Sequence, residues 1–277
     1  MVELILQSLP LAIVASTPLL LAVEGELIVQ RSGVINLGIE GMMLVAAMTA
    51  VIATQLAHSV VAGYVGGIAG AIIVAALFGV FSITFRADQI VTGTAINLLA
   101  VGATSFVYRE MSDLLSAQVP QLAHDVVLPL AWIVIPIALA VLLWMTSFGL
   151  RLRACGENPE AVRHVARYRW SALAIEALLA GLGGAYLSLS LSNGFAENMT
   201  SGRGFIALSI VIFGRWKLKG ALLGTAIFGI AAALQYALQA SNRGLPFHLL
   251  LAVPYVVTLL ILCGVAGRVR APESLGR

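Results

Sequence analysis

VVAGYVGGIAGAIIVAALFGVFSITF, residues 60–85, is a run of apolar and small residues without a charged side chain. A helix needs about 20 mostly apolar residues to cross the hydrocarbon core of a bilayer, so this run is long enough for one crossing. Its apolar residues are continuous and do not alternate with polar ones, which excludes a strand of a membrane β-barrel. The stretch therefore predicts a transmembrane helix.

The same pattern recurs along the whole chain and predicts an all-α polytopic membrane protein. We expect about nine transmembrane helices, within a range of eight to ten because the seventh run is short. Nine crossings would use about 180 residues, so residues 1–277 are expected to form a single transmembrane domain without a separate soluble part. The hydrophobic runs are Leu4–Val23, Val34–Gln55, Val60–Phe85, Ile90–Tyr108, Val126–Phe148, Trp170–Ser190, Gly204–Gly214, Gly220–Leu238 and Pro246–Gly267.

The composition excludes several classes of protein. Charged residues make up 10% of the chain, against about 25% in soluble domains, and hydrophobic residues make up 60%. The mean hydropathy is +0.99 and the pI is about 9.1. This composition excludes a soluble enzyme and a disordered protein. A net charge of +3 on such an apolar chain is also too small to indicate a surface that binds nucleic acid. The two cysteines do not indicate a disulfide framework, and residues 1–10 lack the basic start of a cleaved signal peptide.

Lysine and arginine predict the orientation in the cell membrane. With nine alternating spans, 13 of the 16 basic residues fall on one side. The positive-inside rule places that side in the cytoplasm, which puts the C-terminus inside and the N-terminus outside. Segment 149–169 alone holds five of them: Arg151, Arg153, Arg163, Arg167 and Arg169.

Glycines are frequent inside the predicted spans. Gly63, Gly66, Gly67 and Gly70 form overlapping small-xxx-small pairs in the third span. Small residues let helices approach closely in lipid, where van der Waals packing drives association. We interpret them as compact helix packing, with a dimer face as the alternative.

Polar residues inside a span are functional candidates by default. Asn36 and Glu40 are four residues apart, so both would lie on one helical face, and Gly33, Gly38 and Gly41 around them predict a broken or tightly packed helix. Two interpretations of Glu40 stay open: a polar point beside a translocation pathway, or an internal ion pair with Arg31 or Arg86.

Two further polar residues lie in predicted spans. Asn97 is expected either to hydrogen-bond between helices or to face the pathway. Glu176 is expected to be structural, close enough to the cytoplasmic face to meet Arg167 or Arg169.

The strongest local signal lies between the fifth and sixth spans. Asn158 is a good N-cap, Pro159 suits the first helical position and Glu160 suits the positive end of a helix. The sequence predicts a short helix over about 159–167 with an apolar stripe. The stripe needs a partner, either the membrane surface or a groove in a soluble protein, and the defined helix start favours docking.

Motifs for catalysis, metals and cofactors are absent from the sequence. There is no phosphate-binding G-x-x-x-x-G-K-[ST] loop, no H-E-x-x-H and no paired-cysteine metal spacing. The four histidines are scattered, and no carboxylate pair or Ser-His-Asp order stands out. No catalytic residue, metal or cofactor is therefore predicted.

Three stretches resemble the permease subunits of ABC importers. They are residues 31–43 (RSGVINLGIEGMM), 154–163 (ACGENPEAVR) and 202–216 (GRGFIALSIVIFGRW). The spacing between them also fits, so that the resemblance covers nearly the whole chain. It is closest to the ribose, branched-chain amino acid and simple-sugar group, and within it to permeases for nucleosides.

The resemblance implies a coupling element and a fold. Residues 156–163 look like the helix that sits in a cleft of a separate cytoplasmic ABC ATPase, although valine stands at 162 where the family pattern has alanine. The implied fold is a vitamin-B12-importer-like (type II) bundle of about ten spans, of which this chain is one short at its N-terminus. The implied ATPase-coupling residues are Gly156, Glu157, Asn158, Pro159, Glu160, Ala161, Val162 and Arg163.

The resemblance also implies a cargo and partners. A pathway lined by Asn36, Glu40, Asn97 and Phe205 would suit a polar, ring-bearing solute such as a nucleoside, with a simple sugar as the other candidate. The partners implied are a second, different permease subunit and an extracytoplasmic substrate-binding lipoprotein, within the lipid bilayer.

The sequence leaves two other functions open. An ion-coupled secondary transporter of small polar solutes needs titratable residues near the middle of the membrane, and Glu40 is the only strong candidate in the sequence. A membrane scaffold would use the helix at 159–167 as a generic docking site.

Overall fold

The computed structural model describes residues 2–115, 124–240, 256 and 271–276. Every regular element in these residues is helical, which confirms the predicted fold class. The α-helices are α1 (Val2–Arg31), α2 (Ile39–Ala57), α3 (Val60–Gly79), α4 (Gln89–Glu110), α5 (Ser112–Leu115), α6 (His124–Pro129), α7 (Ile135–Met145), α8 (Ser147–Glu157), α9 (Val165–Tyr186), α10 (Arg203–Phe213) and α11 (Leu218–Ala240). Short π-helical turns follow α3, α6 and α9 as η1 (Val80–Thr84), η2 (Leu130–Val134) and η4 (Leu187–Leu191), and η3 (Pro159–Ala161) is a 3₁₀ turn.

Seven helices in the described residues are long and apolar enough to cross a membrane, and α10 is a shorter apolar helix. The predicted seventh run is therefore a helix of only 11 residues. The predicted ninth run, Pro246–Gly267, lies outside the described residues except for residue 256. The first run was predicted to end at Val23, which is wrong, because α1 continues without a break to Arg31.

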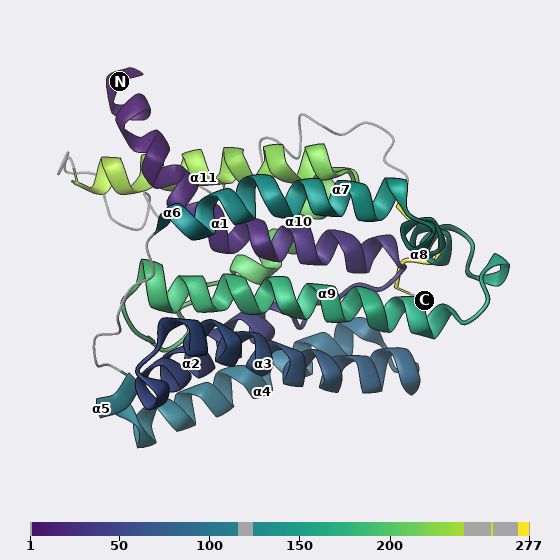
Figure 1. The fold of residues 1–277 in the computed structure, drawn as a ribbon, viewed down its shortest axis with the longest axis horizontal. Coiled ribbons are helices and arrows are strands. Elements are labelled where there is room, and N and C mark those ends of the chain that lie inside the picture. The colour runs from purple at the N-terminus through teal and green to yellow at the C-terminus, as the bar shows by residue number, and fades with distance from the viewer. Residues whose placement is uncertain (1, 116–123, 241–255, 257–270, 277) are drawn as a thin grey trace.

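Helices α1 and α9 form the centre of the bundle (Figure 1). Their apolar windows are 83% and 78% buried, whereas those of α4 and of the α6–α7 span are 28% buried. Leu98 on α4 and Ile137 on α7 are 71% and 59% exposed. Exposed large apolar side chains on the outer helices are expected of a bundle surrounded by lipid, because lipid tails are as apolar as these side chains.

Glycines set the distances between the central helices. A Cβ at Gly181 of α9 would lie 2.7 Å from the Cα of Ile68 on α3. A Cβ at Gly184 would lie 2.8 Å from the Cβ of Ala46 on α2. Because real Cβ contacts are not this short, α9 can pack at this distance only with glycine at both positions.

One end of the bundle carries most of the described basic residues, and we call it the basic end. It holds α8, the loop to α9, the turns after α1, α3 and α10, and residues 271–276 (Figure 1). Ten of the twelve lysines and arginines that the structure describes belong to these elements or to the adjoining ends of α1, α9 and α11.

Two helices begin inside the bundle rather than at its ends. After α1 the chain turns back through the non-helical residues 32–38 before α2 starts at Ile39, and α10 starts only at Arg203 after the irregular residues 192–202. Glu176, in contact with the first of these segments, is eleven residues into α9, about 16 Å from its start at 1.5 Å per residue. That is about half of a 30 Å hydrocarbon core, so both helices begin near the middle of the bundle.

Candidate functional site

Glu40 joins the two helices that begin inside the bundle. Its two carboxylate oxygens accept hydrogen bonds from the backbone N–H groups of Gly202 at 2.7 Å and Gly204 at 2.6 Å. The first N–H groups of a helix lack partners within the helix and attract negative charge. Glu40 therefore caps α10 from the first turn of α2.

Asn36 holds the segment before α2 against α9 and α1. Its side-chain amide donates to Glu176 Oε2 at 2.7 Å, its side-chain oxygen accepts from the N–H of Gly38 at 2.9 Å, and its own N–H donates to Glu26 Oε1 at 3.4 Å. Asn36 is completely buried. The oxygen and the nitrogen of the Asn36 side chain therefore both form hydrogen bonds that fix a stretch of non-helical backbone.

Asn97 holds the same segment from the side of α4. Its oxygen accepts from the N–H of Gly41 at 2.8 Å and its amide donates to the carbonyl of Leu37 at 2.7 Å. We call Asn36, Glu40, Asn97 and Glu176, with the backbone that they bind, the interior junction. Non-helical backbone at membrane depth needs such internal partners because lipid offers none.

Three sequence predictions about these residues need correction. Glu40 forms no ion pair with Arg31 or Arg86, because both its oxygens bind the N–H groups that start α10. Asn36 does not share a helical face with Glu40, since α2 begins after it. Glu176 does not meet Arg167 or Arg169 but lies deeper, bound to Asn36.

Two buried carboxyl groups were missed by the sequence analysis. Glu24 and Glu26 lie in α1 and are completely buried. Both lie beyond the first predicted span, which was expected to end at Val23. Their spacing within an otherwise apolar stretch, residues 19–29, was the available signal that α1 is longer and carries acids into the bundle.

Phe205 differs from the other three predicted pathway residues. It lies in the first turn of α10, directly after the N–H group that Glu40 caps, and it is 46% exposed. Asn36, Glu40 and Asn97 are 0%, 5% and 7% exposed. The structure therefore brings the four residues to one region but leaves only the aromatic ring accessible.

The loop of residues 156–163 lies at the basic end, but its local structure differs from the predicted helix over 159–167. α8 ends at Glu157, Pro159–Ala161 is a single 3₁₀ turn, and α9 begins only at Val165. Asn158 makes no side-chain cap, and His164 has a left-handed backbone with φ of 63° that interrupts any helix through the segment. Glu160 and Arg163 are exposed on this loop.

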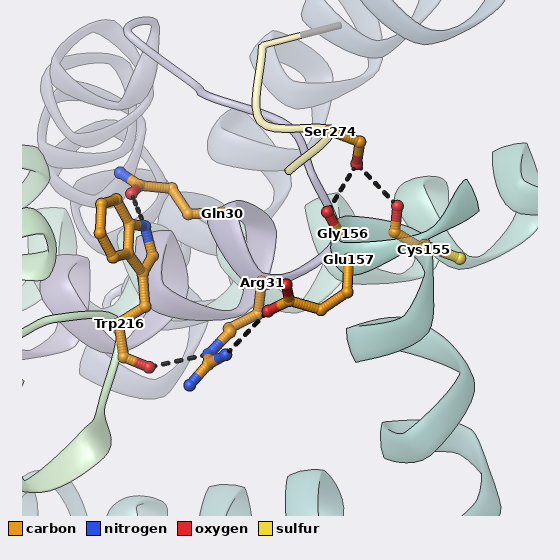
Figure 2. Close-up of polar contacts among 7 residues, drawn as sticks. All are labelled: Gln30, Arg31, Cys155, Gly156, Glu157, Trp216 and Ser274. Atoms are coloured by element: carbon orange, nitrogen blue, oxygen red, sulfur yellow. Dashed lines mark hydrogen bonds and ion pairs between the residues drawn. The ribbon is translucent and has the colours of Figure 1, made fainter. Parts of the chain in front are cut away.

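A chain of polar contacts links this loop to the interior of α1 (Figure 2). The carboxylate oxygen Oε1 of Glu157 lies 3.6 Å from the guanidinium nitrogen Nη1 of Arg31, the last residue of α1. The Nε–H of Arg31 donates to the carbonyl of Trp216 at 2.8 Å. The indole of Trp216 donates to Gln30 at 2.6 Å, and Gln30 donates to Glu26 at 2.7 Å. Glu26 in turn accepts from Asn36 of the interior junction, so the contacts are continuous from the loop to the middle of the bundle.

A cavity of about 780 Å³ opens beside the loop. Its wall comes from the loop, from the turn between α3 and α4, from the start of α9 and from residues 273–276. Both signs of charge line it, through Arg86, Arg169, Asp88, Glu160 and Glu273. The basic end is therefore hollowed next to the exposed loop residues.

Comparison with known proteins assigns the chain to a family. Residues 8–262 match the family described as the permease component of the branched-chain amino acid transport system. The chain belongs to this permease family. It is thus a transport component, and in such systems the ATPase and the substrate-binding protein are separate partner subunits.

Two relatives cover nearly the whole of this permease. The guanosine ABC transporter permease protein NupQ of Bacillus subtilis is 33% identical over 96% of this chain and 94% of its own. The nucleoside ABC transporter permease protein NupC of Lactococcus lactis subsp. cremoris is 31% identical over 95% of this chain and 93% of its own. No solved structure matches the permease significantly.

Proposed function

We propose that this permease subunit forms the translocation pathway of an ATP-driven importer for nucleosides. The observation that carries the proposal is the similarity, over more than nine-tenths of both chains, to two permeases named for guanosine and nucleoside transport. A simple sugar is the second candidate cargo, because a further relative, named as a putative glucose ABC transporter permease, is 33% identical over 83% of this chain. We further propose a different permease as the second subunit and a lipoprotein as the substrate-binding partner.

Uptake by the intact transporter tests the cargo. Cells that carry the complete system and a matched strain without this chain are given labelled guanosine, adenosine, ribose and glucose. We expect nucleoside uptake that depends on this chain and that excess unlabelled nucleoside, but not glucose, suppresses. Uptake of a sugar alone would remove nucleosides as the cargo.

We propose that residues 156–163 are the contact with the ATPase. Three features support this role: the loop lies at the basic end, Glu160 and Arg163 are exposed, and Glu157 begins the contacts that lead through Arg31 to the interior. A docking role does not require the helix that the sequence predicted, since a rigid turn between α8 and α9 also offers a defined surface.

Charge reversal on the loop tests the coupling role. The variant with Glu157→Lys and Glu160→Lys presents two cations where the native loop presents carboxylates. We expect cargo-stimulated ATP hydrolysis and uptake to fall about tenfold or more, as for charged contacts removed from an interface. Glu110→Lys, an exposed change on α4 at the opposite end, is the matched control. Normal uptake in the double variant would remove the loop from the ATPase contact.

We propose that Phe205 faces the cargo, while Asn36, Glu40 and Asn97 shape the pathway by fixing the ends of α2 and α10. The exposure of the ring and the full engagement of the three polar side chains support this division. An aromatic ring suits a nucleobase, which has a flat π-face for stacking. We expect Phe205→Ala to weaken transport, and Phe205→Tyr to preserve it. Ile212→Ala, at an exposed position near the other end of the same helix, should transport normally.

A further inference from the structure

Residues 271–276 lie against the end of α8, more than 100 residues away in sequence. The hydroxyl of Ser274 donates toward the carbonyl oxygens of Cys155 at 2.8 Å and Gly156 at 2.9 Å, and its N–H donates to the same Gly156 carbonyl at 2.9 Å (Figure 2). Ser274 is only 4% exposed. The last carbonyls of a helix have no partner within the helix, so this segment binds two of the carbonyls left at the end of α8, those of Cys155 and Gly156.

The same segment also contacts the chain that leaves α1. The N–H of Gly276 donates to the carbonyl of Gly33 at 3.1 Å. Gly33 has φ of +90°, and a Cβ there would lie 2.5 Å from the Ser274 hydroxyl and 3.1 Å from the guanidinium of Arg169. The close approach therefore requires glycine at 33, both for its backbone and for the space that Ser274 fills.

Gly33 begins the segment that enters the interior junction. Two residues further, the N–H of Ile35 donates to Gln89 at 2.7 Å, and the next residue, Asn36, binds Glu176. Residues 271–276 thus touch the backbone of the coupling loop on one side and the backbone leading into the junction on the other. Gly156 and Arg31 also meet directly, because a Cβ at Gly156 would collide with the carbonyl of Arg31.

We propose that residues 271–276 form a positioning strap, which keeps the loop 156–163 in register with segment 32–38 so that movement of the loop reaches the interior junction. This inference rests on the proposed coupling role of the loop. The strap contacts both segments through hydrogen bonds to their main chains, so a displacement of one displaces the other. Without the strap, Gly156 and Glu157 still contact Arg31, but the described residues hold no hydrogen bond between the loop and Gly33 itself, so less of the loop's movement reaches segment 32–38.

The measurement that tests the strap is the ratio of cargo transported to ATP hydrolysed. The complete transporter, with its ATPase, second permease and binding partner, is reconstituted in proteoliposomes. Ser274→Asp places a carboxylate against the carbonyl oxygens of Cys155 and Gly156, and the repulsion releases the strap. We expect the ratio to fall about fivefold or more, while the ATPase still copurifies and hydrolyses ATP.

Two variants control this experiment. Ser274→Thr keeps the hydroxyl and should keep the native ratio. Ser147→Asp makes the same change at an exposed serine in the first turn of α8 and should also leave the ratio unchanged. Should Ser274→Asp fail to accumulate, Ser274→Ala removes only the hydroxyl and should lower the ratio to a smaller extent.

Two results would overturn the proposal. One is a native ratio in both Ser274→Asp and Ser274→Ala. The other is a variant whose uptake and ATP hydrolysis fall together because the ATPase no longer copurifies, which would make the segment a docking or folding element. Loop variants with Glu157→Lys and Glu160→Lys separate the two claims: if they lose uptake while Ser274→Asp keeps the native ratio, only the strap is wrong.

Discussion

Glu40 is a carboxylate whose two oxygens both bind the start of a different helix. Replacing one oxygen by an amide in Glu40→Gln sets a donor against a backbone N–H and removes the charge that the helix start favours. We expect the free energy of unfolding to fall by about 1–3 kcal/mol and uptake to fall with it. Thermal unfolding of the purified protein in detergent measures the first effect.

Glu110→Gln is the comparison for this variant. Glu110 is exposed at the end of α4, where a single surface carboxylate contributes little to stability. Equal unfolding temperatures for both variants and the native protein would show that Glu40 does not hold α10 in place.

Cys155 is a buried thiol close to the coupling loop. Burial raises the pKa of this thiol above its usual value near 9, and only the thiolate reacts with maleimides. In a Cys263→Ser background we therefore expect very slow labelling of Cys155 at pH 7, with a rate that grows as the pH rises toward 10. A cysteine at exposed position 147 should label quickly, and equally fast labelling of Cys155 would place its side chain at the surface.

At the scale of residues, the sequence identified polar groups but not their partners. Asn36, Glu40 and Asn97 stand out as polar residues in apolar runs, and all three belong to the interior junction. Their partners are Glu176, Gly204 and Gly41, up to 164 positions away. Such distances along the chain leave no local pattern, so the sequence left open whether Glu40 pairs with an arginine or lies beside a pathway, and it did not predict the cap on α10.

Glycines at helix contacts allow a matched test of packing between elements. Gly184→Ala adds a Cβ 2.8 Å from Ala46 and 3.1 Å from the backbone nitrogen of Ala47, which forces α9 away from α2. We expect a loss of about 1–3 kcal/mol, as for other overpacked sites. Gly102→Ala adds a Cβ with nothing within 4 Å on α4, and there we expect a gain of about 0.5–1 kcal/mol.

Thermal unfolding of the two purified glycine variants, each compared with the native protein, measures both changes in stability. Destabilisation by Gly184→Ala together with neutral or improved stability of Gly102→Ala supports the close packing of α9 on α2. If Gly102→Ala were the more damaging change, α4 would have a neighbour at that position and the packing described for it would be wrong.

The sequence predicted which helices exist more accurately than where they begin and end. Long apolar runs predicted α1 to α4, α9 and α11, because a membrane-spanning helix is rich in apolar residues whether it contacts lipid or other helices. The end of α1 was missed because Glu24 and Glu26 resemble loop residues until their burial is known. The helix over 159–167 was wrong because capping residues at Asn158 and Pro159 support a single turn equally well, and the left-handed His164 has no sequence signal.

Orientation is a property of the whole molecule. We propose from the positive-inside rule that the basic end faces the cytoplasm, and α5 lies at the opposite end of the bundle (Figure 1). In a Cys263→Ser background we expect a membrane-impermeant maleimide outside intact cells to label Asp113→Cys but not Arg163→Cys, and both to label in opened cells. Labelling of Arg163→Cys from outside would reverse the orientation and remove the loop from the ATPase.

Family and fold class could be inferred from the sequence because they depend on features spread over the whole chain: continuous apolar runs and three widely spaced stretches of similarity. The internal architecture could not be inferred in the same way. That α10 starts in the middle of the bundle, and that residues 271–276 close over the end of α8, both depend on contacts between segments far apart in sequence. Composition contains no information on such contacts.

The energy source of uptake tests the central claim most directly. The complete transporter is reconstituted in proteoliposomes, and labelled guanosine accumulation is followed with ATP at the ATPase side, with ATP and an uncoupler, and with an imposed proton or sodium gradient in the absence of ATP. An ATP-driven permease predicts accumulation with ATP, unaffected by the uncoupler, and none from a gradient alone. Accumulation that a gradient drives without ATP and that the uncoupler abolishes would contradict the account.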